Sequence, residues 1–363
     1  MWFKQKTAAS NTNWQAQLAS VNSNGVELAM AELLHYQNKT ALIDLSSRKN
    51  IHGQMSGNYL SRSKGRGMEF DEVRHYQTGD DIRAIDWRVT ARTGKTHTKL
   101  FREELERPVL IATDLSASMH FGSQLLFKSV QAAHLAALVA WHAKNRGDRL
   151  GGIVFNQHDH LELKPRSRKE GVLHYLHALT AIHQLQSTAQ QTDLQMSKDQ
   201  NHFTEADSTN PYFENAYFEK NCARIRQIAK PGSLVYLITD AQAIKNTLLK
   251  SSIQNGNTQC DALRHLTHIS RHCELVICLI NDPLEQALPF SSTQLNVTLT
   301  DGINRQQLTL GDKHTATLYQ QHAQSLNDRC QQQLTKAGGR VLCFTAGQTL
   351  EQQLKNEAQF CNN

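Results

Sequence analysis

The sequence predicts an α/β fold in which a mostly parallel sheet carries helices on both faces. Two observations lead to this expectation: apolar runs of strand length alternate with helical patterns, and this alternation begins abruptly at Pro108. Strands that alternate with helices form parallel sheets, because each crossover helix returns the chain to the starting edge of the sheet. With 363 residues, the chain is long enough to bury a sizeable core.

Residues 1–105 form an N-terminal segment that is polar and irregular. The stretch "MAELLHYQNKTALIDL" within it predicts a helix followed by a short strand. Residues 62–108 are dense in Gly, Asp and Arg, and turn sequences such as "TGDD" and "RTGK" separate short extended pieces. We expect this segment to pack against a domain formed by residues 106–363.

Strands and helices alternate through residues 106–363. Strands are expected at 108–116, 148–156, 160–165, 232–242, 273–282 and 340–347, with a hairpin at 294–310. Helices are expected at 124–145, 168–185, 211–229, 261–270 and 315–338. The residues from about 186 to 210 are rich in Gln, Ser, Thr and Asp, and they predict a mobile loop.

The composition argues against several classes of protein. A net charge of +6 is mild and does not require a nucleic-acid partner. Seven cysteines without a C-x-x-C pair indicate reduced thiols rather than a disulfide framework or a zinc site. No apolar run approaches the roughly 18 residues of a membrane span, and the first residues lack the apolar region of a signal peptide. We therefore expect a cytoplasmic protein with neither a membrane span nor a nucleic-acid partner.

The stretch "LIATDLSASMHFG" begins as a buried strand and then places Asp114, Ser116 and Ser118 at alternate positions. Another strand, "LVYLITD", also ends in an aspartate, Asp240. Parallel sheets bind ligands at the carboxyl ends of their strands. Two carboxylates and two hydroxyls make an oxygen shell that suits Mg2+, with Mn2+ as an alternative, whereas Zn2+ prefers His or Cys.

This strand end also has a purely structural interpretation, in which Ser116 and Ser118 cap the next helix and Asp114 binds backbone amides. A haloacid-dehalogenase-type phosphatase would need an aspartate where Ser116 stands, and a response-regulator receiver would need an early acidic pair. The chain has no G-x-x-x-x-G-K-[ST], G-x-S-x-G or H-E-x-x-H motif. Without an activated nucleophile or a poised base, the site is expected not to be catalytic.

At "DLSAS" the chain resembles the von Willebrand factor A-type fold, whose metal-ion-dependent adhesion site reads D-x-S-x-S, with a Thr and an Asp from later loops. A narrower resemblance covers "SRSKGRGMEFDEVRHYQTGDDIRAIDWRVTARTGK" and "LFREELERPVLIATDLSASM". These stretches closely resemble the bacterial domain-of-unknown-function family 58. The resemblance runs from about Ile51 to Asn156. It resumes more loosely at "GSLVYLITD" and over the C-terminal stretches "LTDGINRQQLTL" and "LYQQHAQSLNDRCQQQLTKAG". The family has a von Willebrand A-like domain and is usually encoded beside a MoxR-type AAA+ ATPase.

The resemblance implies which residues hold the metal ion. Asp114, Ser116 and Ser118 match D-x-S-x-S, and Asp240 matches the later aspartate. The family's threonine has no clear counterpart, because no G-T motif lies between the two strands. Thr209 is the candidate, because "STNPYFENAYFEKNCARI" is similar to the segment that follows such a threonine. Thr192, Thr204 and Ser208 remain alternatives.

The function that the resemblance implies is adhesive. An incomplete oxygen shell leaves one coordination position open, and an Asp or Glu of a protein client fills it. We therefore expect a non-enzymatic, Mg2+-dependent adaptor that acts with a MoxR-type AAA+ ATPase in chaperone-like assembly or maturation. One alternative is a metal-dependent phosphoryl-transfer or hydrolytic enzyme at the same site. Another is a scaffold that has lost its metal.

The upstream motif "GDDIRAIDW" gathers Asp80, Asp81, Arg83, Asp86 and Trp87. We favour a structural network of aspartates and arginine that fixes the N-terminal segment onto the sheet, with Trp87 packed beneath it, because irregular charged segments commonly bury their polar groups in this way. The alternative is a docking surface for a partner. Basic and acidic residues interleave here, which is not the pattern of a nucleic-acid-binding arm.

Two histidine-rich stretches, "FNQHDHLEL" and "RHLTHISRHC", raise the question of a zinc site. Their histidines are His158 and His160, expected on a strand, and His265, His268 and His272, at helical spacing. No cysteine or acidic partner completes a zinc shell at a recognisable spacing. An exposed strand edge and a polar helix face therefore explain these residues better.

Overall fold

The computed structural model describes residues 14–43, 68–103, 108–199, 211–254, 261–289, 295–300 and 305–360. The chain divides into two compact units. One consists of Met1–Gly53 together with Arg107–Asn363, and the other consists of Gln54–Glu106. The sequence pattern grouped residues 1–105 as one segment, whereas the structure assigns the first part of that segment to the same unit as the large sheet.

A six-stranded sheet forms the centre of the first unit, with strand order β10-β7-β6-β3-β4-β5. The strands are β3 (Pro108–Asp114), β4 (Arg149–Phe155), β5 (His160–Arg166), β6 (Leu234–Thr239), β7 (Glu274–Asn281) and β10 (Arg340–Thr345). Neighbours pair in parallel, except that β5 pairs antiparallel with β4 at one edge. The central strands are almost wholly buried, as continuous runs of Val, Ile and Leu predict for strands covered on both faces.

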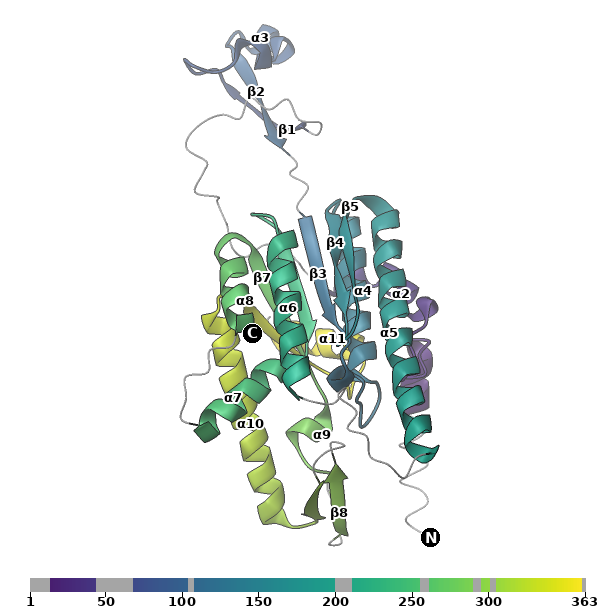
Figure 1. The fold of residues 1–363 in the computed structure, drawn as a ribbon. Coiled ribbons are helices and arrows are strands. Elements are labelled where there is room, and N and C mark those ends of the chain that lie inside the picture. The colour runs from purple at the N-terminus through teal and green to yellow at the C-terminus, as the bar shows by residue number, and fades with distance from the viewer. Residues whose placement is uncertain are drawn as a thin grey trace. The chain divides into compact units, whose positions relative to one another are not determined.

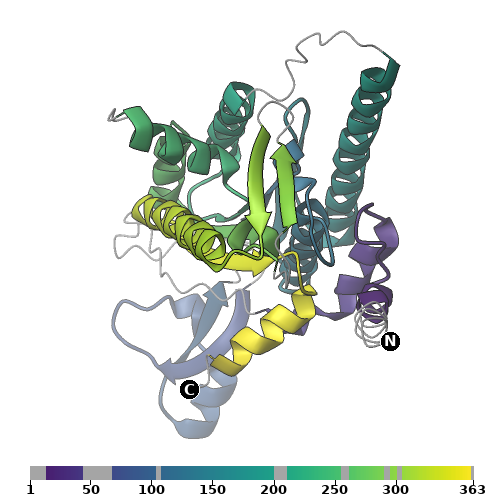
Figure 2. The same cartoon turned by 90° about the horizontal axis from the view of Figure 1, so that it is seen from below.

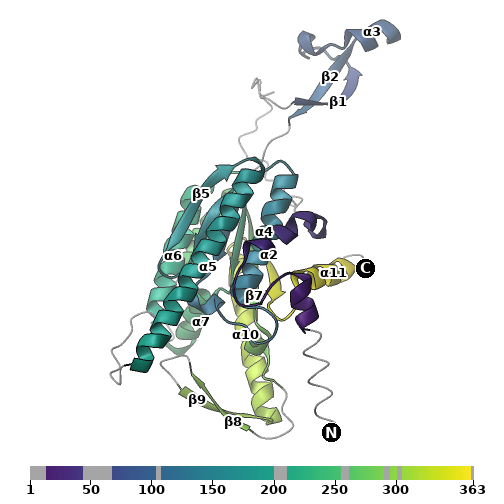
Figure 3. The ribbon, with the colours of Figure 1, turned by 90° about the vertical axis from the view of Figure 1, so that its right-hand side faces the viewer.

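Helices cover both faces of this sheet (Figures 1 and 3), which confirms the predicted α/β fold class. On one face lie α4 (Lys128–Asn145), α5 (Arg168–Asp199) and α11 (Leu350–Phe360), and on the other lie α6 (Pro211–Ile228), α7 (Gln242–Gln254), α8 (Asp261–His272) and α10 (Lys313–Lys336). Each helical layer forms its own hydrophobic core against the sheet. No helix in the described ranges is long and apolar enough to cross a membrane.

The short elements after β7 complete this unit. Helix α9 (Pro283–Gln286) follows β7, and the strands β8 (Leu295–Thr300) and β9 (Arg305–Leu310) pair antiparallel, as predicted for a hairpin. Figure 2 shows this hairpin in front of the sheet. The sequence pattern did not predict α7, α9 or α11. Helix α9 is a single short turn, and polar residues make up most of α7 and α11.

The N-terminal residues 14–43 pack against α4. Helix α2 (Met30–His35) is followed by two 3₁₀ turns, Tyr36–Asn38 and Thr40–Leu42. The indole Nε1 of Trp141 donates a hydrogen bond to the Leu33 carbonyl at 3.1 Å. The prediction of a short strand after this helix is wrong for Thr40–Leu42, which forms a 3₁₀ turn instead. Asn145 Nδ2 on α4 donates a hydrogen bond to Thr40 Oγ1 at 2.9 Å and holds this turn.

The mobile loop expected at about 186–210 is also wrong in its first part. Helix α5 continues to Asp199, and residues 200–210 lie outside the described ranges. No glycine or proline interrupts residues 172–199, so nothing in the backbone chemistry ends the helix once it has begun.

The second unit is a hairpin with a short helix. Strands β1 (Met68–His75) and β2 (His97–Glu103) pair antiparallel, and α3 (Trp87–Thr93) lies in the connection between them. Aspartates organise this connection: Asp80 pairs with Arg74 at 2.8 Å, and Asp86 caps α3 by accepting from the Arg88 and Val89 amides. Asp81 accepts from the Arg83 amide.

The upstream motif therefore forms a network inside its own unit, but two details of the expectation are wrong. The arginine that pairs with Asp80 is Arg74, and Arg83 takes part only through its backbone. The side chain of Trp87 is 67% exposed rather than packed beneath the aspartates, because Trp87 begins α3 and its neighbour Asp86 is used as the helix cap.

Candidate functional site

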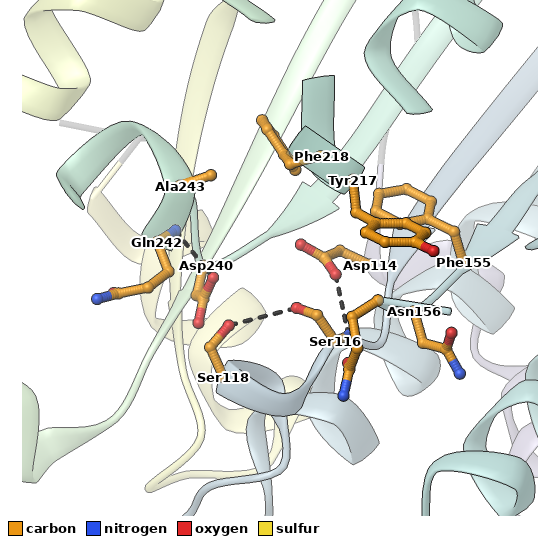
Figure 4. Close-up of a pocket in the computed structure, with 11 residues that line it drawn as sticks. Asp114, Ser116, Ser118, Phe155, Asn156, Tyr217, Phe218, Asp240, Gln242 and Ala243 are labelled. Carbon is orange, nitrogen blue, oxygen red and sulfur yellow. Dashed lines mark hydrogen bonds between the residues drawn. The ribbon is translucent and has the colours of Figure 1, made fainter. Parts of the chain in front are cut away.

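Two strand ends bring the predicted site together. Strand β3 ends at Asp114, and Asp240 follows β6 directly. Because β3 and β6 are parallel neighbours, with Thr113 paired to Ile238, both aspartates lie at the same edge of the sheet. They line one pocket (Figure 4) together with Ser116, Ser118, Phe155, Asn156, Gln157, Tyr217, Phe218, Gln242 and Ala243.

The carboxylate of Asp114 is buried and held on both oxygens. Oδ1 accepts a hydrogen bond from the Ser116 amide at 3.0 Å, and Oδ2 accepts one from the Thr239 hydroxyl at 2.8 Å. The second contact comes from the adjacent strand β6, so the sheet itself fixes the rotamer of Asp114. Each carboxylate oxygen keeps a further lone-pair site for a ligand in the pocket.

The two serine hydroxyls do not serve as helix caps. Ser116 precedes the 3₁₀ turn Ala117–Met119 but makes no side-chain capping bond, and α4 begins after Phe127. Instead, Ser116 Oγ and Ser118 Oγ lie 3.3 Å apart (Figure 4). The Ala117 amide between them donates to Gln157 Oε1 at 2.8 Å, which steadies the turn. This geometry differs from the one expected if the two serines only capped the next helix.

Asp240 is held by a buried cation. Its Oδ1 accepts from the Gln242 amide at 3.0 Å, while Oδ2 accepts from the Lys128 ammonium at 2.9 Å. Lys128 also donates to Glu285 Oε1 at 2.5 Å. Ala241 has a left-handed backbone, with φ of 55°, and this turn directs the Gln242 amide back to Asp240. Such a conformation costs a non-glycine residue about 1 kcal/mol, and it often marks a functional position.

The electrostatics of the two aspartates differ. Burial and then the neighbouring carboxylate of Asp240 raise the pKa of Asp114 to about 7, against the hydrogen bonds from Thr239 and Ser116. Burial acts in the same direction on Asp240, but Lys128 and Lys245 outweigh it and hold the pKa of Asp240 below its usual value. Among the described residues, Asp240 therefore has a cation partner and Asp114 has none.

This donor set fits a hard divalent cation. The donors are carboxylate and hydroxyl oxygens, which Mg2+ and Mn2+ prefer, and the described residues that line the pocket include no histidine or cysteine. Among the described residues, no group of three or more His, Cys, Asp or Glu side chains is arranged to hold a metal ion. The two histidine-rich stretches thus form no zinc cluster within the described ranges, and a cation in the pocket would rely on the serines as well as the aspartates.

Four of the five predicted ligands meet in this pocket: Asp114, Ser116, Ser118 and Asp240. Thr209, Thr204 and Ser208 lie outside the described residues. Thr192 belongs to α5. Helix α6 begins two residues after Thr209 and places Tyr217 and Phe218 in the pocket lining.

Sequence reasoning missed Lys128 and Thr239, the side chains that hold the two aspartates. Lys128 opens α4, a helix buried on almost every side, so its charge had to be paired internally. The sequence contained one indication of this pairing, namely a lysine at the start of an apolar helix. Thr239 gave no comparable signal, because a threonine is ordinary in a strand.

The fold and the site define the general class of the protein. It is an α/β protein with a Rossmann-like, mostly parallel sheet and a polar pocket at the carboxyl ends of two neighbouring strands.

Comparison with known proteins narrows this class. A family described as "Protein of unknown function DUF58" matches residues 72–329, which is more than half of the chain, so the chain belongs to that family. Uncharacterized proteins of Mycobacterium bovis and Mycobacterium tuberculosis are 34% identical to it over 114 residues, covering 31% of this chain and 36% of each relative. The match spans about a third of the length of these curated relatives.

Proposed function

We propose that this protein is a non-enzymatic, Mg2+-dependent protein-binding adaptor with a von Willebrand A-like fold. It acts with a MoxR-type AAA+ ATPase in chaperone-like assembly or maturation of a protein client. The observation that carries the proposal is the pair of hydroxyls, Ser116 and Ser118, which lie beside two aspartates in one pocket without a capping role.

In this proposal the chain's residues share the work of holding a cation. Asp114 and Asp240 supply negative charge, and the two serine hydroxyls supply neutral oxygens. Lys128 and Lys245 offset the negative charges of Asp240 and Glu285, so a divalent cation bound beside Asp114 keeps an excess positive charge. That excess favours a carboxylate from a protein partner, the client or the ATPase, as an additional ligand. The ATPase supplies the hydrolysis that the adaptor lacks.

The alternative, a metal-dependent phosphoryl-transfer or hydrolytic enzyme, has one observation in its favour. The pKa of Asp114 near 7 is suited to a general base. Against it, neither serine hydroxyl in the pocket is hydrogen-bonded to a described histidine or lysine that would activate it. Turnover of p-nitrophenyl phosphate with Mg2+ that is lost in Asp114→Asn would favour the enzyme.

Calorimetric titration of Mg2+ and Mn2+ into the full chain tests the metal site. We expect saturable binding that is lost in Asp114→Asn and retained in Asp261→Asn, a matched change at an exposed aspartate of α8. Absence of binding to the wild-type protein would contradict a metal site in the free protein.

A binding assay tests the partner. The purified MoxR-type ATPase from the same genome is expected to bind the wild-type chain in Mg2+ and to dissociate in EDTA. Asp261→Asn should bind as the wild type does, and Asp114→Asn should not. Binding that is equal in EDTA and Mg2+ would remove the metal from the proposal.

A further inference from the structure

The connection between β1 and β2 in the second unit exposes two large apolar side chains. Trp87 begins α3 and is 67% exposed, and Ile82, in the 3₁₀ turn Ile82–Ala84 before it, is 66% exposed. They are the two most exposed large hydrophobic side chains of the described residues. In Figure 1, α3 lies at one end of the hairpin formed by β1 and β2. Two such side chains in one short stretch differ from the single exposed apolar residues that any protein surface carries.

The second unit has little hydrophobic core of its own. Burial is described for its residues 72–99, and within that range only Thr98 is fully buried. A two-stranded hairpin is marginally stable by itself and needs a further element over an apolar face. Helix α3 contributes Val89, which is only half-buried. Burying Trp87 and Ile82 against a partner would therefore supply apolar contact that the described part of this unit does not provide.

The aspartate network fixes the position of the exposed tryptophan. Asp86 caps α3 through the first backbone amides of that helix and also lies 3.6 Å from the Lys99 ammonium on β2. Asp80 pairs with Arg74 on β1 at 2.8 Å. Trp87 directly follows the cap, so its backbone is ordered before any partner arrives. A side chain held in this way loses little conformational freedom on binding, which favours affinity.

The outward side of α3 combines this tryptophan with arginines. Trp87, Arg88, Ala91 and Arg92 are all exposed, and at 3.6 residues per turn they lie on one side of the helix. Val89, on the other side, is half-buried. Tryptophan and arginine are the residue types most enriched among the side chains that dominate protein–protein binding energy.

The charges of the second unit argue for a protein partner. Gln54–Glu106 contains ten Lys and Arg residues against nine Asp and Glu residues, a net charge of +1. Nucleic acids and anionic membranes are bound through a strongly positive field, which this unit lacks. Individual guanidinium groups instead pair best with carboxylates, which they can bind through two hydrogen bonds. Exposed Trp87 in turn requires an apolar pocket.

The rest of the chain does not supply the acidic complement. The first unit contains the other 29 of the 39 basic residues and the other 24 of the 33 acidic residues, which gives it a net charge of +5. A second copy of the whole chain carries +6. Electrostatic complementarity therefore favours a different, acidic protein over the first unit or a second copy.

We propose that the outward side of α3, together with Ile82, docks a protein partner whose surface offers an apolar pocket bordered by carboxylates. Trp87 fills the pocket, and Arg88 and Arg92 pair with the carboxylates. The inference adds a docking point to the proposed function and does not rest on the cation site. The two can fail separately, because none of these residues lines the strand-end pocket.

The probe is a phage library of random peptides, selected against the full chain in EDTA so that no divalent cation contributes. Binding of the recovered synthetic peptides is compared between Trp87→Ala and the matched control Trp14→Ala, at a tryptophan of the first unit that is 44% exposed. We expect peptides with Asp or Glu beside a large apolar residue. Trp87→Ala should weaken their binding about thirtyfold, the scale of a dominant interface residue, and Trp14→Ala should bind as the wild type does.

Two further readouts separate docking from folding. Trp87→Ala should keep the wild-type melting temperature, because the indole is exposed. Hydrogen exchange of the wild-type chain, read by mass spectrometry, should slow on peptide binding within residues 76–96 and remain unchanged elsewhere.

The charge arm of the test uses arginines. Arg88→Glu/Arg92→Glu should weaken peptide binding about tenfold or more. Its matched control is Arg271→Glu/Arg340→Glu, at two exposed arginines of the first unit. The control changes the net charge by the same amount, so equal losses in both double variants would indicate a general field rather than pairing at α3.

Four results would overturn the inference. The library yields no peptide, the recovered peptides lack acidic residues, Trp87→Ala binds them as Trp14→Ala does, or the two arginine double variants bind equally. Binding to phosphatidylglycerol vesicles or to single-stranded DNA that falls in Trp87→Ala, without peptide binding, would assign the surface to a membrane or a nucleic acid. A chain that binds these peptides but no Mg2+ would refute the proposed cation site and support this surface.

Discussion

Asp114 is expected to destabilise the metal-free protein, and replacing it with asparagine should reveal by how much. The carboxylate is buried beside a second carboxylate, and its pKa is raised from 3.8 to about 7. An asparagine has nearly the same shape and cannot ionise. Its oxygen can still accept from the Ser116 amide, and its amide can donate to the Thr239 hydroxyl oxygen.

The sign and size follow from the pKa shift of Asp114. Below the unfolded pKa of 3.8 the carboxyl is neutral in both states, and its contribution to stability is fully present. As the pH rises from 3.8 to about 7, only the unfolded state releases its proton, so stability is lost. Three pKa units at about 1.4 kcal/mol each give a loss of about 4 kcal/mol above pH 7.

Urea unfolding in EDTA, followed by circular dichroism over this pH range, measures the effect. The advantage of Asp114→Asn over the wild type should grow by about 1.4 kcal/mol per pH unit and then level off near pH 7. Asp261→Asn should show no such slope, because Asp261 is exposed. A stability difference that does not change with pH, or a variant less stable than the wild type above pH 7, would refute the reasoning.

Three further outcomes are expected. Lys128→Met should lower the free energy of unfolding by about 3–5 kcal/mol, because Asp240 then remains as a buried charge without its ammonium; unchanged urea unfolding would contradict this. Mg2+ affinity measured by calorimetry should fall about tenfold per pH unit below pH 7, since protons compete for Asp114, and a flat profile would argue that Asp114 is not a ligand. Gly152→Ala should cost about 3 kcal/mol or more, because the new Cβ would lie 2.0 Å from the Ile111 carbonyl oxygen; a wild-type melting temperature would contradict the close packing of β3 and β4.

The elements that were predicted correctly from the sequence are those with a strong local pattern of apolar residues. The buried strands β3, β4, β6 and β7 and the edge strand β10 read as short apolar runs, and each is found where expected. Helices rich in polar residues were harder to predict. Helices α7 and α11 were not predicted, and the length of α5 was underestimated. These helices depend on the sheet and neighbouring helices for stability, and local propensity carries little of that information.

The sequence by itself determined that two strands end in aspartates and that Ser116 and Ser118 follow the first of them, because this spacing is local. Only the tertiary structure decided that Lys128 holds Asp240 and Glu285, which lie 112 and 157 residues away along the chain. The physical reason is burial. A charge inside the unit must find a partner wherever packing places one, and that partner is set by the three-dimensional fold rather than by spacing.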